Sequence, residues 1–375
     1  MRRTIVFVFL AFICACFETS GNNAEENHPD SLITVIDGLG RSMQVPWNPD
    51  HVICSGPGCL RLLVYLQAQD RVVAVDDMEG RRDQFDARPY FLANPWLGDL
   101  PVFGEFRGHD NPELILALNP QPQVIFKTYP EMGMDPQELQ EKTGIPVVVL
   151  SYGDLGSNRD QLNSSLRIMG TVLNREERAE EVLSFFDSTI QDLHSRSELA
   201  GLDSLPSCYI GGIAYRGPHG FQSTEPGYLP FKLIGMSNIA LDYCTGPEEH
   251  ADVAKEQIVA WNPDFIFLDI STLQCDPQTS ALYQLQNDPA YSFLSGDVYG
   301  MLPYNWYTEN FGSTLANAYF AGSVLIPDGF TDVDPKLMAD SIYTFLVGQP
   351  VFESLNQGFS HLAFARILPD DNHAP

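Results

Sequence analysis

Residues 113–120 read ELILALNP, and residues 256–263 read EQIVAWNP. The two stretches share glutamate, isoleucine, alanine, asparagine and proline at matching positions. Each copy leads into an apolar run and then the tripeptide Asp-Pro-Gln, at 124–126 and 135–137 in the first copy and at 265–268 and 276–278 in the second. Two copies are too few for a solenoid. The repeat therefore predicts two similar lobes, with a ligand cleft where they meet, because small molecules bind preferentially at domain interfaces.

The rest of the chain alternates short apolar runs with helical patterns. Residues 33–46 predict a hairpin that turns at Asp37-Gly38. Further strands are expected at 51–54, 71–75, 124–126, 147–150, 207–213, 238–241, 265–268 and 297–302, and helices at 60–67, 136–143, 311–325 and 335–347. This alternation is typical of mostly parallel sheets covered by helices. The predicted fold class is α/β, with two similar three-layer lobes.

Residues 159–198 carry a long apolar stripe at helical spacing, in which Asn174 and Glu177 resemble a capping box. We expect one long helix connecting the lobes, although a surface helix of one lobe would show the same pattern. The predicted organisation is a signal peptide at 1–15, a tether at 16–31, an N-terminal lobe at 32–157, a connecting helical segment at 158–200, a C-terminal lobe at 201–362 and a tail at 363–375.

The first residues have the features of an export signal. Arg2 and Arg3 precede an apolar run that is too short to span a bilayer. The sequence Ile13-Cys14-Ala15-Cys16 resembles a bacterial lipoprotein signal, which predicts cleavage before Cys16 and lipidation of its thiol. An ordinary secretory signal with an incidental cysteine is the alternative. The expected location is the periplasm or the outer face of the cytoplasmic membrane, with the lipid as the only membrane attachment.

The net charge and the cysteines limit the possible binding partners, disulfides and metal sites. A formal net charge of −28 repels nucleic acid, so nucleic-acid binding is not expected. An exported protein can form disulfides, and a pair among Cys208, Cys244 and Cys275 is one candidate. Cys54 and Cys59 are expected to be buried thiols. No spacing of cysteine or histidine indicates a directly bound metal, and no cofactor is expected.

With these features in place, residues 33–358 resemble the solute-binding lipoproteins of ABC importers, in the class that carries ferric siderophores, haem, cobalamin and some metal oxyanions. The opening hairpin, both "helix, Asn-Pro, strand" units and the stretch LPYNWYTENFGSTLANAYFAGSVL (302–325) carry the resemblance. It implies two lobes joined by one long helix, a ligand held between them, no catalysis, and a monomer that works with a permease and its ATPase. In that family an acid of each lobe docks onto the permease. Glu113 and Glu256 are candidates, although favourable interaction with the helix dipole would also explain them.

The ligand residues are predicted from the loops that follow the strands, because ligands of open α/β sheets bind beyond the carboxyl ends of the strands. These loops are rich in cations and aromatic rings, which suit an anionic, partly aromatic complex such as an iron(III) chelate. The predicted ligand residues are Arg81, Arg88, Tyr90, Lys127, Tyr129, Tyr215, Arg216, His219, Tyr304, Asn305, Trp306 and Tyr307.

Four alternatives stay open at this point, two of which concern the ligand and two the class of protein. Cobalamin would use the aromatic rings more than the arginines, and molybdate or tungstate would need a tighter polar pocket. An exported hydrolase built on Cys59 and His219 lacks any recognisable catalytic motif. A cell-surface receptor could use the same cleft without feeding a permease.

Overall fold

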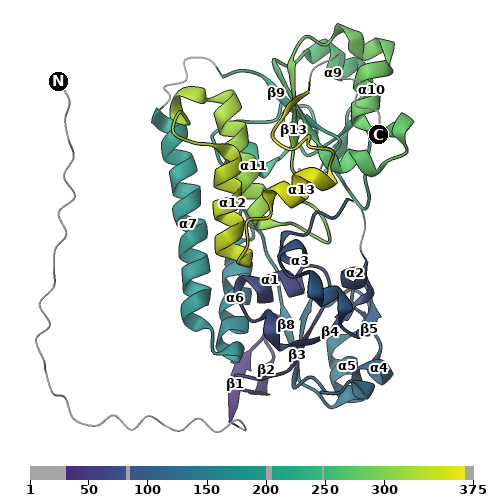
Figure 1. Ribbon diagram of the computed structural model, residues 1–375, viewed down its shortest axis with the longest axis vertical. Helices are drawn as coiled ribbons and strands as arrows, with labels where there is room; N and C mark the ends of the chain where they lie inside the picture. Colours follow the sequence, from purple (N-terminus) through teal and green to yellow (C-terminus); the bar gives the residue numbers. More distant parts are fainter. Residues whose placement is uncertain (1–30, 82–84, 200–204, 247–248, 368–375) are drawn as a thin grey trace, which may run out of the picture.

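The computed structural model describes residues 31–81, 85–199, 205–246 and 249–367. The signal peptide, Cys16 and nearly all of the predicted tether lie outside the described residues. Figure 1 shows two α/β lobes along the long axis, with helix α7 (Glu176–Leu199) beside them. The predicted fold class is confirmed. None of the helices within the described ranges is long and apolar enough to cross a membrane.

The N-terminal lobe is built on a six-stranded sheet of order β6-β5-β4-β3-β7-β8. Its strands are β3 (Val52–Ser55), β4 (Val72–Asp76), β5 (Val102–Glu105), β6 (His109–Asp110), β7 (Val124–Thr128) and β8 (Val147–Leu150). All pairs are parallel except that of β6 with β5. Every residue of β3, β7 and β8 is buried, as expected for strands covered on both faces.

Short helices cover this sheet, and a hairpin packs beside it. The helices are α1 (Cys59–Tyr65), α2 (Asp77–Gly80), α3 (Pro89–Ala93), α4 (Pro112–Ala117) and α5 (Pro136–Thr143). The hairpin of β1 (Leu32–Ile36) and β2 (Ser42–Pro46) pairs Ile33 with Val45. The hairpin turns at Asp37-Gly38, as the sequence predicts, and the Asp37 carboxylate accepts hydrogen bonds there from the Leu39 and Arg41 amides.

The C-terminal lobe has a four-stranded sheet of order β14-β13-β12-β9. Strands β9 (Cys208–Gly211), β12 (Phe265–Asp269) and β13 (Asp297–Met301) are parallel, and β14 (Arg366–Ile367) is antiparallel. Strands β10 (Ser223–Thr224) and β11 (Ala251–Asp252) form a separate short pair. The helices are α8 (Leu229–Lys232), α9 (Lys255–Trp261), α10 (Ala281–Asn287), α11 (Phe311–Leu325), α12 (Pro335–Val347) and α13 (Phe352–Gly358).

The sequence repeat is a structural repeat. Helix α4 leads through Asn119-Pro120 into β7, and helix α9 leads through Asn262-Pro263 into β12. The Asp-Pro-Gln echoes differ. Asp135 caps helix α5, whereas Pro277 begins a 3₁₀ turn, and the helix after the second strand, α10, begins only at Ala281.

The connecting segment is two helices, which corrects part of the prediction. Helix α6 (Arg159–Leu173) ends at Asn174, whose backbone is left-handed at φ 52°. Asn174 is therefore the end of one helix and not the N-cap of the next, because asparagine tolerates this conformation better than most residues. Helix α6 packs on β1 and β8 of the N-terminal lobe, whereas α7 also contacts α11 of the other lobe.

Two smaller expectations are also wrong. Residues 238–241 make one isolated bridge, between Asn238 and Cys208, instead of a strand. The Asn238 side chain donates to Thr224 Oγ1 and the Glu225 carbonyl, which favours a turn at this point. The candidate disulfide among Cys208, Cys244 and Cys275 is not formed, and all three are free thiols. Cys54 and Cys59 are buried thiols, as predicted.

Candidate functional site

A cavity of about 400 Å³ lies between the two lobes. This volume falls within the range of small-molecule sites. All the lining residues come from segments that follow the carboxyl ends of strands, which is the position expected in α/β sheets. The N-terminal lobe provides Pro57, Met78, Phe106, Arg107, Tyr129 and Met132, and the C-terminal lobe provides Ala214, Tyr215, Arg216, Gly217, Pro218, Gln274, Asn305, Trp306, Tyr307 and Thr308.

Each lobe contributes one arginine to this cavity. Arg107 follows β5 and Arg216 follows β9, and both side chains are exposed. Their guanidinium groups lie 5.2 Å from the rings of the preceding residues, Phe106 and Tyr215. Neither guanidinium forms an ion pair with any carboxylate of the described residues. In a chain with this excess of acid, two unpaired arginines facing one cavity can bind an anionic group from either side.

Several cavity residues have backbone conformations that are unfavourable for any residue other than glycine. Arg107, Tyr129, Arg216, Tyr307 and Thr308 all have positive φ, between 50° and 66°. Each such residue costs roughly 1–2 kcal/mol, and residues of this kind gather at functional sites. The strain therefore supports, on independent grounds, the assignment of this cavity as the candidate site.

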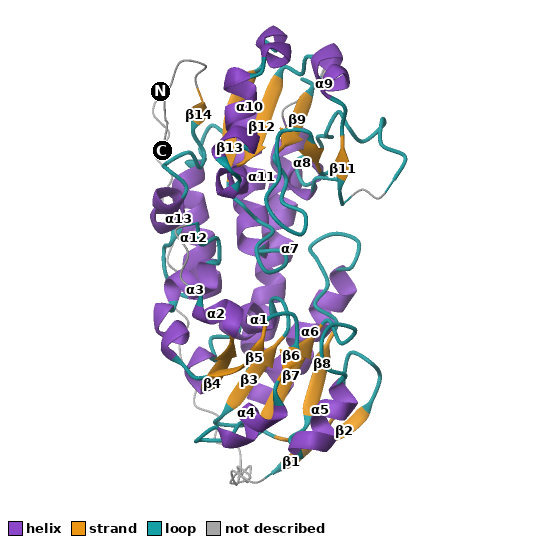
Figure 2. Ribbon diagram, turned by 90° about the vertical axis from the view of Figure 1, so that its right-hand side faces the viewer, coloured by secondary structure: helices purple, strands orange, loops and turns teal. Residues whose placement is uncertain are grey.

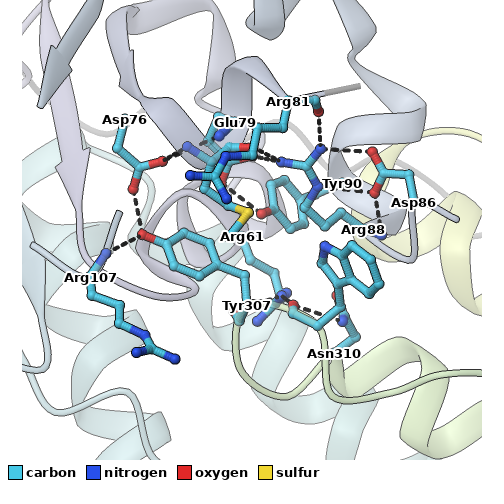
Figure 3. A network of polar contacts seen from close by, with 12 residues as sticks. Arg61, Asp76, Glu79, Arg81, Asp86, Arg88, Tyr90, Arg107, Tyr307 and Asn310 are labelled. Carbon is cyan, nitrogen blue, oxygen red and sulfur yellow. Dashed lines mark hydrogen bonds and ion pairs between the residues drawn. The ribbon is translucent and has the colours of Figure 1, made fainter. Parts of the chain in front are cut away.

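The lobes touch each other at the floor of the cavity. Figure 3 shows Tyr307 of the C-terminal lobe, whose hydroxyl donates to Asp76 Oδ2 at 2.5 Å. The same hydroxyl accepts a hydrogen bond from the Arg107 amide at 3.1 Å. Nearby, the Tyr129 and Thr308 hydroxyl groups are 2.8 Å apart. Burial, reinforced by the charge of Glu79, raises the pKa of Asp76 to about 7.

Half of the predicted ligand residues line this cavity: Tyr129, Tyr215, Arg216, Asn305, Trp306 and Tyr307. The structure brings them together from both lobes, and their contact with a ligand remains a prediction. Arg107 is not among the predicted ligand residues, because residues 102–105 are too short and too irregular to be recognised as a strand from the sequence. An arginine followed by glycine after that strand was the available signal.

Arg81, Arg88 and Tyr90 are not among the residues that line this cavity, although the Arg81 guanidinium lies 5.1 Å from the ring of the lining residue Phe106. Arg88 is buried, and its guanidinium pairs with Asp86 at 2.7 Å and with Glu79 at 2.9 Å (Figure 3). The Tyr90 hydroxyl donates to the same Glu79 at 2.7 Å. Arg81 forms a half-exposed pair with Asp77. These local acids satisfy the charges that the sequence alone left unpartnered.

Lys127, Tyr304 and His219 also support the site from outside the cavity. Lys127 is fully buried and donates to Asp110 Oδ2 at 2.6 Å and to the Gly108 carbonyl at 3.1 Å, which holds the loop that carries Arg107. The Tyr304 hydroxyl donates to the Glu225 carboxylate. His219 Nε2 lies 2.7 Å from the Tyr215 carbonyl and braces the loop that carries Arg216.

The two candidate docking acids lie far from the cavity. Glu113 is exposed in the first turn of α4, and Glu256 is exposed in the first turn of α9. Figure 2 places α4 in the lower lobe and α9 at the far end of the upper lobe. Each acid lies where it interacts favourably with the helix dipole, which would explain its presence without a partner protein. Permease docking remains a prediction for both acids.

The site has no arrangement for direct metal binding or for nucleophilic catalysis in the described part of the chain. Residues 31–81, 85–199, 205–246 and 249–367 contain no group of three or more histidine, cysteine or acidic side chains that could hold a metal ion. Cys59 is fully buried. Burial and the neighbouring Cys59 raise the pKa of Cys54, whereas a reactive cysteine needs a lowered pKa.

A model of a family described as periplasmic binding protein matches residues 52–295, more than half of the chain. The chain therefore belongs to the periplasmic binding proteins, which are substrate-binding components of ABC importers and not enzymes. Proteins of this family are extracytoplasmic. No protein with a curated description matches the chain by sequence.

Solved structures show the same fold at low sequence identity. The molybdate-bound periplasmic binding protein MolA of Haemophilus influenzae is 20% identical, with a TM-score of 0.62 over 85% of this chain and 98% of its own. A periplasmic solute-binding protein of Veillonella parvula is 18% identical, with a TM-score of 0.64 over 87% and 96%. The FepB protein of Veillonella parvula is 18% identical, with a TM-score of 0.58 over 84% and 97%.

Proposed function

We propose that this protein captures an iron(III)-siderophore or a similar metal chelate and delivers it to an ABC permease and its ATPase. The observation that carries the proposal is the pair Arg107 and Arg216, which reach one cavity from opposite lobes without carboxylate partners among the described residues. An anionic ligand between them would neutralise both charges and would bridge the lobes. Arginine is suited to this role because its fork matches carboxylate and catecholate oxygens.

The rest of the lining favours a partly aromatic ligand over a small oxyanion. Tyr129, Tyr215, Trp306 and Tyr307 offer ring faces, and Met78 and Met132 add apolar surface. Molybdate and tungstate are small and are held best by polar donors on all sides, which this lining does not provide. Cobalamin suits the aromatic rings but leaves the two arginines unused. The same class of cavity could also serve a receptor that feeds no permease.

The proposed setting is outside the cytoplasm, with Cys16 as the lipidated first residue of the mature chain. A tether at 16–31 would then connect the lipid to the lobes, divided as 32–157, 158–200 and 201–362 with a tail at 363–375. The protein would act as a monomer, and Glu113 and Glu256 would face the permease. Metabolic labelling with a radioactive fatty acid tests the anchor, because Cys16→Ser should abolish incorporation.

A thermal-shift screen tests the ligand class. The panel contains the ferric complex of 2,3-dihydroxybenzoate, ferric citrate, haem, cyanocobalamin, molybdate and tungstate. A ligand present at 100 times its Kd stabilises the folded protein by about 2.7 kcal/mol. The proposal expects a shift with a ferric complex and none with the oxyanions. A shift with molybdate alone, or with cyanocobalamin alone, would overturn it in favour of that ligand.

A further inference from the structure

Arg61 of helix α1 reaches from the N-terminal lobe into the loop that follows β13 in the C-terminal lobe. Its side chain is fully buried. Nη1 donates to the Glu309 carbonyl at 2.7 Å, and Nη2 donates to the Trp306 carbonyl at 2.9 Å and the Tyr307 carbonyl at 3.3 Å. Figure 3 shows the guanidinium below Tyr307, close to the residues of this loop. One side chain thus binds three backbone carbonyl groups of a single loop in the opposite lobe.

The surroundings of Arg61 explain why its donors are directed at carbonyl groups. No carboxylate of the described residues forms an ion pair with it. Its guanidinium lies 5.2 Å from the Tyr90 ring and 5.9 Å from the Tyr152 ring. A buried charge is unfavourable unless its hydrogen bonds are satisfied. Tyr152 extends the network, because its hydroxyl accepts from Arg61 and donates to the Glu309 carbonyl at 2.7 Å.

The segment that Arg61 holds is the one that brings aromatic rings into the cavity. Tyr307 and Thr308 are left-handed at φ 50° and 66°, a conformation that needs support from its surroundings. Gly58, one turn before Arg61, permits the close approach. A Cβ at Gly58 would lie 2.6 Å from Thr308 Cγ2 and 2.3 Å from the Tyr152 ring.

We propose that Arg61 is a positioning residue for ligand binding, which fixes the Trp306–Thr308 segment against the N-terminal lobe without touching the ligand. The inference rests on the proposed function, in which the ligand occupies this cavity. The position of the Trp306–Thr308 segment in the C-terminal lobe then depends on a side chain of the N-terminal lobe. Separation of the lobes would break the hydrogen bonds from the guanidinium to the carbonyl groups, and the segment would lose this support.

The test replaces Arg61 by lysine and compares it with a matched variant, Arg178→Lys. Arg178 also donates to backbone carbonyl groups, but to those of Tyr65 and Phe345 and not to those of the loop that follows β13. Lysine keeps the charge in both variants and loses the fork. Tyr152→Phe is a milder second variant, since it keeps the ring and removes the hydroxyl that joins Arg61 to Glu309.

Two readouts are measured on the full chain. Hydrogen exchange without ligand should be at least tenfold faster for peptides covering 304–310 in Arg61→Lys, and also faster in Tyr152→Phe, with no change there in Arg178→Lys. Affinity for the ferric complex of 2,3-dihydroxybenzoate should fall at least tenfold in Arg61→Lys and less than twofold in Arg178→Lys. If Arg61→Lys does not fold, Tyr152→Phe carries both comparisons.

The two proposals fail in different ways. If the wild type binds no ferric complex, the proposed function fails, and the exchange data alone decide whether Arg61 positions the segment. If the wild type binds but Arg61→Lys and Tyr152→Phe match it in both exchange and affinity, the positioning role is wrong and the proposed function stands.

Discussion

Replacing Arg88 with methionine is expected to destabilise the N-terminal lobe strongly and to leave ligand binding nearly unchanged. The Arg88 guanidinium donates twice to Asp86, at 3.0 and 2.7 Å, and once to Glu79, at 2.9 Å. It also donates to the carbonyl groups of Met78 and Arg81, at 2.7 and 2.8 Å. Methionine keeps much of the volume and removes all five hydrogen bonds.

The size of the loss in the free energy of unfolding follows from the two carboxylates that Arg88→Met leaves without their partner. Asp86 and Glu79 are both buried, and removing one partner of a buried pair typically costs about 3–5 kcal/mol. Burial already raises the pKa of Glu79, and loss of the Arg88 charge would raise it further. The double variant Arg88→Met/Glu79→Gln should recover part of the loss, because it no longer leaves that carboxylate unpaired.

Urea unfolding followed by circular dichroism measures the free energy of unfolding, and calorimetric titration with the ferric complex measures affinity. Arg81→Met is the control, because its pair with Asp77 is about half exposed and should be worth less than about 1 kcal/mol. A loss below about 1 kcal/mol in Arg88→Met, together with a tenfold loss of affinity, would show that Arg88 reaches the ligand and that the structural assignment is wrong.

Three further predictions concern single side chains. Lys127→Met should lower the free energy of unfolding in urea by about 3–5 kcal/mol, because Asp110 is buried and would lose its partner. The control is Lys142→Met, which removes the exposed ion pair with Glu138, and a smaller loss in Lys127→Met than in this control would contradict the prediction. Tyr307→Phe should cost about 1–3 kcal/mol, because Asp76 loses a donor; equal unfolding curves would show that the contact between lobes is not made. Burial raises the pKa of Asp269 from 3.8 to about 7, so the folded protein keeps a proton that the unfolded chain releases. The contribution of this carboxyl group to stability should therefore fall as the pH rises from about 4 to about 7. Asp269→Asn should flatten this dependence of stability on pH, and an unchanged slope would refute the prediction.

Much of the fold is predictable because its signals are local. The repeat around Asn119-Pro120 and Asn262-Pro263 identifies two equivalent units, and buried strands such as β7 and β12 follow as continuous apolar runs. Helix boundaries were less predictable. Asparagine is common both as an N-cap and as the left-handed residue that ends a helix, so the sequence alone does not assign the role of Asn174. The packing of α6 against β1 and β8 of the N-terminal lobe decides between the two roles.

The site was predictable as a set of loops but only partly as a set of side chains. The rule that ligands bind beyond strand ends identified both the loop of Tyr129 and the loop of Tyr307. Which side chains face the cavity depends on ion pairs that the sequence pattern does not reveal. Lys127 turns to Asp110, and Arg88 turns to Glu79, because burial makes an ion pair more favourable than an unpaired charge. Arg107 remains exposed because none of the described carboxylates pairs with it.

The most direct test of the central claim is calorimetric titration of the ferric complex of 2,3-dihydroxybenzoate into the wild type, Arg107→Met, Arg216→Met and the double variant. Both arginines are exposed and form no ion pair with any described residue, so folding should not change. Each single variant should lose at least about tenfold in affinity, equivalent to about 1.4 kcal/mol, and the double variant should lose more. Binding by the double variant with wild-type affinity would contradict the assignment of this cavity as the site for an anionic chelate.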